Sequence, residues 1–185
     1  MTGLLTRAAR VATTPQILNM VAKVYIPVLF PLTFLILLLG IRIDEMLALP
    51  QLLEAPANYW ASLISFTVGT GIWLVSYSSI VFEGKGSPSP TAGRTQELVT
   101  TGIYAYCRYP SVHGKLLGIL AVGLFVNSTS FCVILVPLLL LGSIAEKVWR
   151  QDPQNHRIFG EAYAAYAAEV PMFFPWKAFR TSQKI

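Results

Sequence analysis

The chain has 185 residues, of which 54% are hydrophobic and 12% charged, and its mean hydropathy is +0.57. Soluble domains carry about 25% charged residues, so this composition excludes an ordinary water-soluble fold and predicts a single membrane domain, 1–185. The net charge of +5 comes from cations beside the apolar runs, without interleaved base-stacking aromatics. That pattern excludes nucleic acid as a partner and favours contact with anionic lipid.

Four apolar runs predict an all-α, polytopic membrane helical bundle. The first run, 24–41, is just long enough to cross a hydrocarbon core of roughly 30 Å, and the second, 59–82, is longer. The runs 111–126 and 131–150 are joined by the polar residues Asn127-Ser128-Thr129-Ser130. They predict a helical hairpin with short arms. We therefore expect four membrane-embedded helices, as two crossings plus a hairpin.

The polar segments between and beyond these runs complete the predicted architecture. Residues 1–23 are interpreted as an interfacial segment with a short helix from Pro15, and 83–110 as a long polar loop. Residues 155–185 predict a C-terminal amphipathic helix and tail, because four apolar or aromatic residues recur at helical spacing: Phe159, Tyr163, Tyr166 and Val170.

The distribution of cations predicts the orientation in the bilayer. The connection between the first two runs carries Arg42 against three acids, whereas the N-terminal segment and the tail are rich in Lys and Arg. The positive-inside rule then places both termini in the cytoplasm, and the loop 83–110 on the same side.

The beginning of the third run and the end of the fourth carry the residues most able to do chemistry. Tyr104, Tyr106, Arg108 and Tyr109 precede the third run, and Pro110 suits the first turn of its helix. The cluster is either an interfacial aromatic belt with an arginine anchor or part of a site.

Glu146 lies at the end of the fourth run, where an acid is costly unless it has a partner or a task. Lys147, Arg150 or Arg108 are alternative ion-pair partners for it.

The histidines and cysteines limit the chemistry further. His113 and His156 are the only histidines and lack metal-ligand spacing, so we expect no metal. His113 is either a general base or a packed polar group. Cys107, beside Arg108, is either a nucleophile or a small space-filling residue.

Three segments in series resemble integral membrane methyltransferases. The stretch from Gly102 through Arg108-Tyr109-Pro110 to Gly114 resembles the signature G-P-Y-x-Y-x-R-[HN]-P-x-Y-x-G. The loop Gly84-Lys85-Gly86-Ser87-Pro88-Ser89-Pro90 resembles G-K-G-T-P-x-P, and Glu146 with Phe159-Gly160-Glu161-x-Tyr163-x-x-Tyr166 resembles the E-E…F-G-x-x-Y-x-x-Y tail. This group includes isoprenylcysteine carboxyl methyltransferases and phospholipid N-methyltransferases. Ile103, Tyr109 and Val112 depart from the signature, and Glu146 is the only acid of the pair.

The resemblance implies S-adenosylmethionine as cofactor, bound without a Rossmann domain in a cytoplasmic-side pocket. The cofactor-binding residues that it implies are Tyr104, Tyr106, Arg108, Pro110, His113, Gly114, Glu146, Tyr163 and Tyr166. The implied catalytic residues are Arg108, His113 and Glu146, with Arg108 holding a carboxylate and Glu146 an ammonium or ribose hydroxyl.

The resemblance also implies that a lipid or lipidated acceptor enters from the bilayer. The expected acceptor is the carboxylate of an isoprenylcysteine-like substrate. A phospholipid amine is the alternative, and a non-catalytic membrane scaffold of the same fold is a third interpretation.

Overall fold

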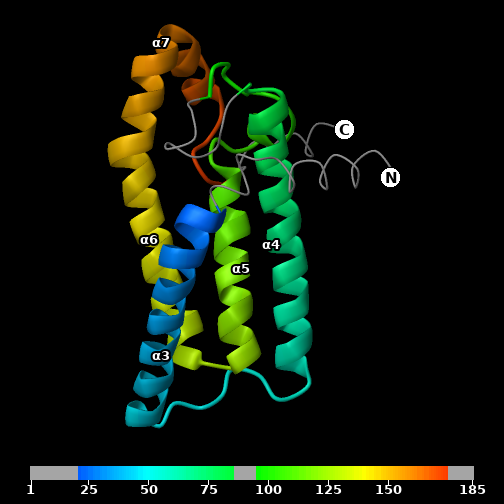
Figure 1. The fold of residues 1–185 in the computed structure, drawn as a ribbon, viewed down its shortest axis with the longest axis vertical. Coiled ribbons are helices and arrows are strands. Elements are labelled where there is room, and N and C mark those ends of the chain that lie inside the picture. The colour runs from blue at the N-terminus through cyan, green and yellow to red at the C-terminus, as the bar shows by residue number, and fades with distance from the viewer. Residues whose placement is uncertain (1–20, 86–94, 175–185) are drawn as a thin grey trace.

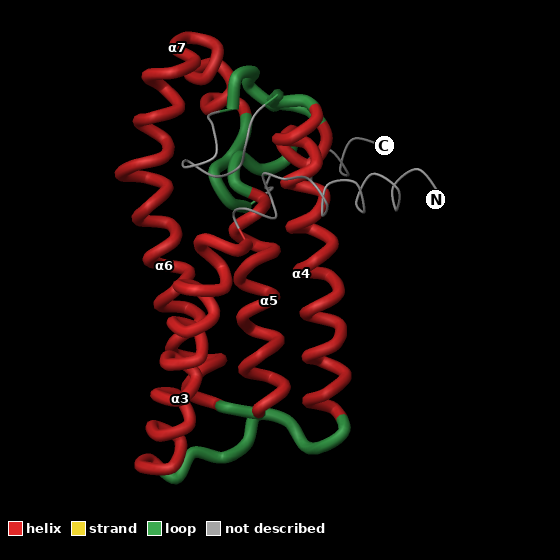
Figure 2. Tube along the Cα trace, viewed as in Figure 1, coloured by secondary structure: helices red, strands yellow, loops and turns green. Residues whose placement is uncertain are grey.

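The computed structural model of the chain describes residues 21–85 and 95–174. Within these ranges the chain is helical, with no β-strand, and loops gather at the two ends of the long helices (Figure 2). The predicted all-α membrane bundle is confirmed. The interfacial helix from Pro15, the Gly86–Pro90 pattern and the end of the tail lie outside the described residues.

The first membrane helix continues well past the predicted end at Ile41. A π-helical stretch, Val21–Leu29, leads into α3 (Phe30–Leu47). The polar residues that suggested an end at Ile41 have partners within the fold: Arg42 pairs with Glu45 at 2.8 Å along the same helix. The helix therefore accommodates charge without breaking.

Helices α4 (Ala57–Phe82) and α5 (Pro110–Val126) pack closely side by side (Figure 1). A Cβ atom added to Gly114 would lie 2.7 Å from the Gly69 carbonyl oxygen, so only glycine permits this backbone approach. Along the same seam, the Ser62 hydroxyl donates to the Ala121 carbonyl at 2.7 Å. Close backbone contact and interhelical hydrogen bonds are the usual means of helix association in lipid.

The second arm of the hairpin is much longer than the prediction 131–150. A π-helical start, Phe131–Leu135, leads into α6 (Val136–Glu146), a second π-helical stretch, Lys147–Gln151, and α7 (Asp152–Glu169). Gly160 has non-helical backbone angles (φ 55°, ψ −131°), so residues 161–169 form a separate helical segment after a kink, whereas residues 155–159 are continuous with this arm. Pro153 does not interrupt it because it lies in the first turn of α7, where a missing N–H costs least.

Three of these helical segments are long and apolar enough to cross a membrane: Ile26–Leu47, Ala57–Phe82 and Phe131–Glu169. The apolar helix Pro110–Val126 is shorter. Large apolar side chains such as Phe34, Leu35 and Leu141 are more than half exposed, as lipid-facing residues are. The chain is an integral membrane protein.

Figure 1 shows the end of the bundle that lies far from α7. Side-chain hydrogen bonds close this end. The Asp44 carboxylate accepts from the Ser128 hydroxyl at 2.5 Å and from the Ser130 backbone N–H at 2.8 Å. The Asn127 amide exchanges hydrogen bonds with the Leu53 backbone. These contacts bind α3 to the start of the last helical run.

Candidate functional site

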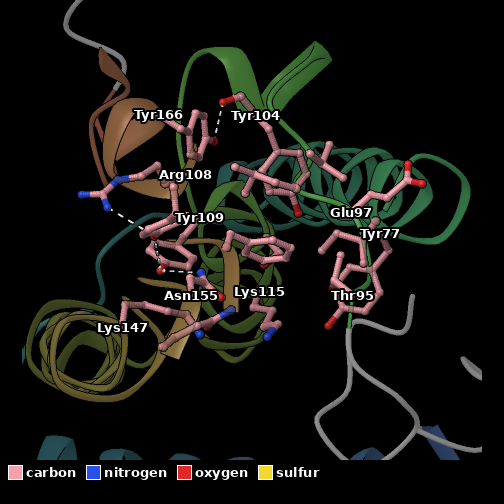
Figure 3. A pocket seen from close by; sticks show the side chains of 17 residues that line it. Tyr77, Thr95, Glu97, Tyr104, Arg108, Tyr109, Lys115, Lys147, Asn155 and Tyr166 are labelled. Atoms are coloured by element: carbon pink, nitrogen blue, oxygen red, sulfur yellow. Dashed lines mark hydrogen bonds between the residues drawn. The ribbon is translucent and has the colours of Figure 1, made fainter. Parts of the chain in front are cut away.

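A pocket of about 130 Å³ lies at the opposite end of the bundle (Figure 3). The end of α4, the segment 95–109, the start of α5 and the last helical run all contribute to its wall. Its lining is rich in tyrosine, with Tyr77, Tyr104, Tyr109, Tyr163 and Tyr166. The wall therefore combines aromatic faces with hydroxyl groups.

The Asp152 carboxylate accepts hydrogen bonds from three of the pocket-lining residues, although Asp152 itself does not line the pocket. Its Oδ1 accepts from Arg108 Nη1 at 2.6 Å, from the Tyr109 hydroxyl at 3.0 Å and from the Tyr163 hydroxyl. Asn155, one turn further along α7, donates to the Tyr109 hydroxyl at 3.3 Å. We call these five residues the Asp152 network.

Burial determines the protonation states in this network. Desolvation, followed by the hydrogen bond with Tyr163, raises the pKa of Tyr109 far above its ordinary value, so its phenol stays neutral. Desolvation alone would lower the pKa of Arg108, but Tyr163 and Asp152 raise it, so the guanidinium stays charged. Arg108 Nε is buried and has no hydrogen-bond partner in the described structure. This N–H is therefore able to donate to an acceptor on a bound ligand.

A second set of contacts fixes Tyr104 and Tyr166. The Tyr166 hydroxyl donates to the Tyr104 carbonyl oxygen at 2.7 Å, which ties α7 to the 3₁₀ turn Gly102–Ala105. The Tyr104 hydroxyl donates to the Ser76 carbonyl of α4 at 3.3 Å, and burial raises the pKa of this phenol. Both rings are therefore oriented by the backbone of neighbouring elements.

The segment after α7 folds back along the start of α5. The backbone N–H groups of Arg108 and Tyr109 donate to the carbonyls of Pro171 and Met172 at 3.0 and 3.2 Å. The buried Cys107 thiol donates to the Met172 carbonyl at 3.3 Å, and desolvation raises its pKa. This environment favours the thiol over the thiolate, so it supports the space-filling role for Cys107.

Two lysines complete the charged part of the lining. Lys147 pairs with Glu146 at 2.6 Å and lies 5.6 Å from the centre of the Tyr109 ring. Lys115 lines the same pocket from α5 (Figure 3). Glu146 thus has the first of the ion-pair partners that the sequence suggested.

The structure brings together four of the predicted site residues as pocket lining: Tyr104, Arg108, Tyr163 and Tyr166. The other five lie outside the lining. Tyr106 is exposed, and Pro110 and Gly114 are buried at the start of α5. His113 packs against Phe173. Glu146 contacts the site only through its ion pair with Lys147. The roles assigned to all nine stay predictions.

Sequence reasoning missed Asp152, Asn155 and Lys115 as contributors to this region. A signal for the first two existed: Asp152 and Asn155 lie at helical spacing before Phe159, two turns and one turn back along α7 and ahead of the kink at Gly160. Because the predicted membrane helix ends at residue 150 and the predicted tail helix begins at residue 155, Asp152 lies between the two.

No group of three or more His, Cys, Asp or Glu side chains that could hold a metal occurs in residues 21–85 and 95–174. The site instead offers aromatic rings, hydroxyls, one largely buried guanidinium, two ammonium groups and the Glu97 carboxylate. Such a set suits an organic ligand that carries both positive and anionic groups.

A model of the family described as phospholipid methyltransferase matches residues 57–161. The matched region begins with α4 and ends in α7, so it contains most of the pocket wall. No curated protein and no solved structure matches the chain.

Proposed function

This chain belongs to the phospholipid methyltransferase family, and we propose that it transfers a methyl group from S-adenosylmethionine to a membrane lipid. It is a membrane methyltransferase whose apolar helices suit a lipid substrate. The observation that carries the proposal is the tyrosine-lined pocket at one end of the membrane helices, because Arg108 and most of the other lining residues lie inside the matched region.

The pocket residues fit the cofactor chemically. S-adenosylmethionine supplies an activated methyl group on a sulfonium cation. Tyrosine faces attract such a cation in a desolvated site, and Tyr104, Tyr163 and Tyr166 are buried there. The unpartnered Nε of Arg108 is placed to donate to the cofactor's carboxylate.

The chain's own residues would contribute by binding and alignment. Methyl transfer is an in-line displacement, so holding donor and acceptor at the correct angle supplies much of the rate. The Asp152 network fixes Arg108 and two tyrosines, which gives the site a preorganised wall. The segment 171–172 covers the start of α5 and helps to exclude water.

We propose a phospholipid amine as the first candidate acceptor, because the matched family is described by phospholipid methylation. An amine must lose a proton before or during transfer, and His113 is the proposed base; it lies one turn into α5, outside the pocket lining and against Phe173. An isoprenylcysteine-type carboxylate is the second candidate, favoured by the resemblance of 102–114 to the methyltransferase signature. We also propose that the pocket faces the cytoplasm, on the basis of the cation distribution.

The first experiment supplies the purified full chain with cofactor labelled in the methyl group and a total lipid extract. We expect a labelled phospholipid from which alkali releases no labelled methanol, as N-methylation gives. Alkali-labile release of labelled methanol would instead identify a carboxylate ester. No incorporation into any lipid, together with no saturable binding of the demethylated cofactor by calorimetry, would favour the scaffold interpretation and refute the proposal.

A variant test addresses the site itself. Arg108→Gln should weaken binding of the demethylated cofactor by about tenfold or more, because it removes a buried charged donor. Arg150→Gln removes an exposed cation outside the pocket lining and should bind as the unaltered chain does. Equal affinity in both variants would remove Arg108 from the proposed site.

A further inference from the structure

We propose that Lys115 binds an anionic oxygen group in the headgroup of the lipid acceptor. This inference rests on the proposed function and names the class of substrate that the pocket selects. The anionic group is either the phosphate diester of a phospholipid or the carboxylate of a lipidated amino acid.

The charge balance of the pocket wall singles out Lys115. Each other charged side chain in the lining belongs to an ion pair: Arg108 with Asp152 at 2.6 Å, Lys147 with Glu146 at 2.6 Å and Glu97 with Lys85 at 2.6 Å. Lys115 has no hydrogen bond or ion pair within residues 21–85 and 95–174. The described lining therefore carries one uncompensated positive charge.

The rest of the sequence holds no acidic side chain that could pair with Lys115. All nine Asp and Glu residues lie within the described ranges, and residues 1–20, 86–94 and 175–185 contain none. The nearest acid in electrostatic terms is Glu146, and it is already paired with Lys147. The missing anion is thus expected to come from a ligand.

The side chain of Lys115 is exposed and lines the pocket, so a ligand in the pocket can reach it. It lies five residues into α5, or about 7 Å along the helix axis from Pro110. The ammonium of Lys147 repels it from the facing helical run. An anion bound beside these two ammonium groups would reduce the repulsion between them.

The side of the pocket on which Lys115 lies favours the acceptor over the cofactor as the source of this anion. Arg108 and the buried tyrosines lie before α5 and on α7, whereas Lys115 lies further along α5, within the apolar part of the bundle. On the facing run, α6 has no buried residue, and its Leu138 and Leu141 are more than half exposed, as lipid-facing residues are. A lipid headgroup arriving along α6 meets Lys115 from the bilayer.

The experiment measures methyl-transfer kinetics of the full chain in mixed micelles of fixed composition. Lys115→Gln should raise the KM for a phospholipid amine by about tenfold, the loss expected for one charge-assisted hydrogen bond. The affinity for the demethylated cofactor, measured by calorimetry, should stay within twofold. Lys115→Arg should restore KM to within a few fold. Arg150→Gln, an exposed cation on the same end of the bundle, is the matched control.

Two further acceptors identify the anion. With a long-chain primary amine that has no phosphate, Lys115→Gln and the unaltered chain should have the same KM. With a prenylcysteine, a rise in KM equal to that for the phospholipid would assign the carboxylate as an alternative source.

Three outcomes would overturn the inference while leaving the proposed function intact: an unchanged KM for every acceptor, an equal rise for the phosphate-free amine, or a loss confined to cofactor affinity. Absence of methyl transfer by the unaltered chain would instead refute the proposed function.

Discussion

Arg108 and Asp152 form a largely buried ion pair of 2.6 Å, with side chains 11% and 18% exposed. The two residues are 44 positions apart, and they join the start of α5 to the start of α7. Asp152 does not line the pocket. It acts as a positioning residue for the arginine and tyrosines that do.

Asp152→Asn should lower both stability and cofactor binding. The substitution leaves the Arg108 charge buried without a compensating anion, and such losses cost about 3 kcal/mol in unfolding free energy. Thermal unfolding in detergent and calorimetry with the demethylated cofactor measure the two effects. Glu161→Gln, an exposed acid on the same helix, is the control and should change neither. Similar behaviour of the two variants would contradict the positioning role.

Gly114→Ala should damage the contact between α4 and α5. The added Cβ would lie 2.7 Å from both the Gly69 carbonyl oxygen and the Trp73 backbone nitrogen, so the helices must separate. We expect a loss of about 2 kcal/mol from overpacking, with reduced methyl transfer because Arg108 moves with α5. Gly118→Ala meets nothing within 4 Å and should not destabilise the protein. Unfolding midpoints of the two variants decide the matter.

Stability should fall as the pH rises above 10, and Tyr109 should contribute to that fall. The phenol has an ordinary pKa of 10.0, and burial and Tyr163 raise it in the folded protein. Above pH 10 the unfolded chain releases this proton and the folded chain keeps it, so unfolding becomes easier by up to about 1.4 kcal/mol per pH unit. Tyr109→Phe should have a shallower slope between pH 10 and 11 and the same slope as the unaltered chain below pH 9. Identical slopes throughout would place the Tyr109 hydroxyl in a more hydrated environment.

Asp44→Ala should reduce stability without changing substrate affinity. The carboxylate caps the start of the last helical run through the Ser130 N–H, and losing such a cap costs about 1 kcal/mol. Asp44 and its hydrogen-bond partners lie at the end of the bundle away from the pocket, so KM values for lipid and cofactor should be unchanged (Figure 1). Glu45→Ala, which removes only an exposed ion pair with Arg42, should cost less. An altered KM for Asp44→Ala would show coupling between the two ends.

The helices could be predicted because hydrophobicity alone determines where a chain can reside in lipid. The start of α5 at Pro110 and the polar turn 127–130 could also be predicted, because Pro and small polar residues mark helix ends. The ends of α3 and of the last helical run could not be predicted in this way. Arg42 and Arg150 suggested boundaries, but charged residues at a bilayer surface do not by themselves stop a helix.

The site could be predicted only in part, for a different reason. Tyr104, Arg108, Tyr163 and Tyr166 belong to recognisable local patterns, and the structure places all four in one pocket wall. Asp152 and Lys115 depend on which segments meet in three dimensions. The role of Asp152 depends on its ion pair with Arg108, 44 residues away, and the role of Lys115 depends on its having no ion-pair partner among the described residues. Neither relationship can be predicted from local spacing.

The contact between residues 108–109 and 171–172 also bears on how the protein is made. Synthesis proceeds from the N-terminus, so α4 and α5 can pair in the membrane before α7 exists. Until Asp152 and the segment after Glu169 have emerged, Arg108 has no counter-charge and the pocket has no cover. The site is therefore completed only after residues 152–172 have been translated, and a shorter nascent chain should remain unable to modify the lipids into which it is being inserted.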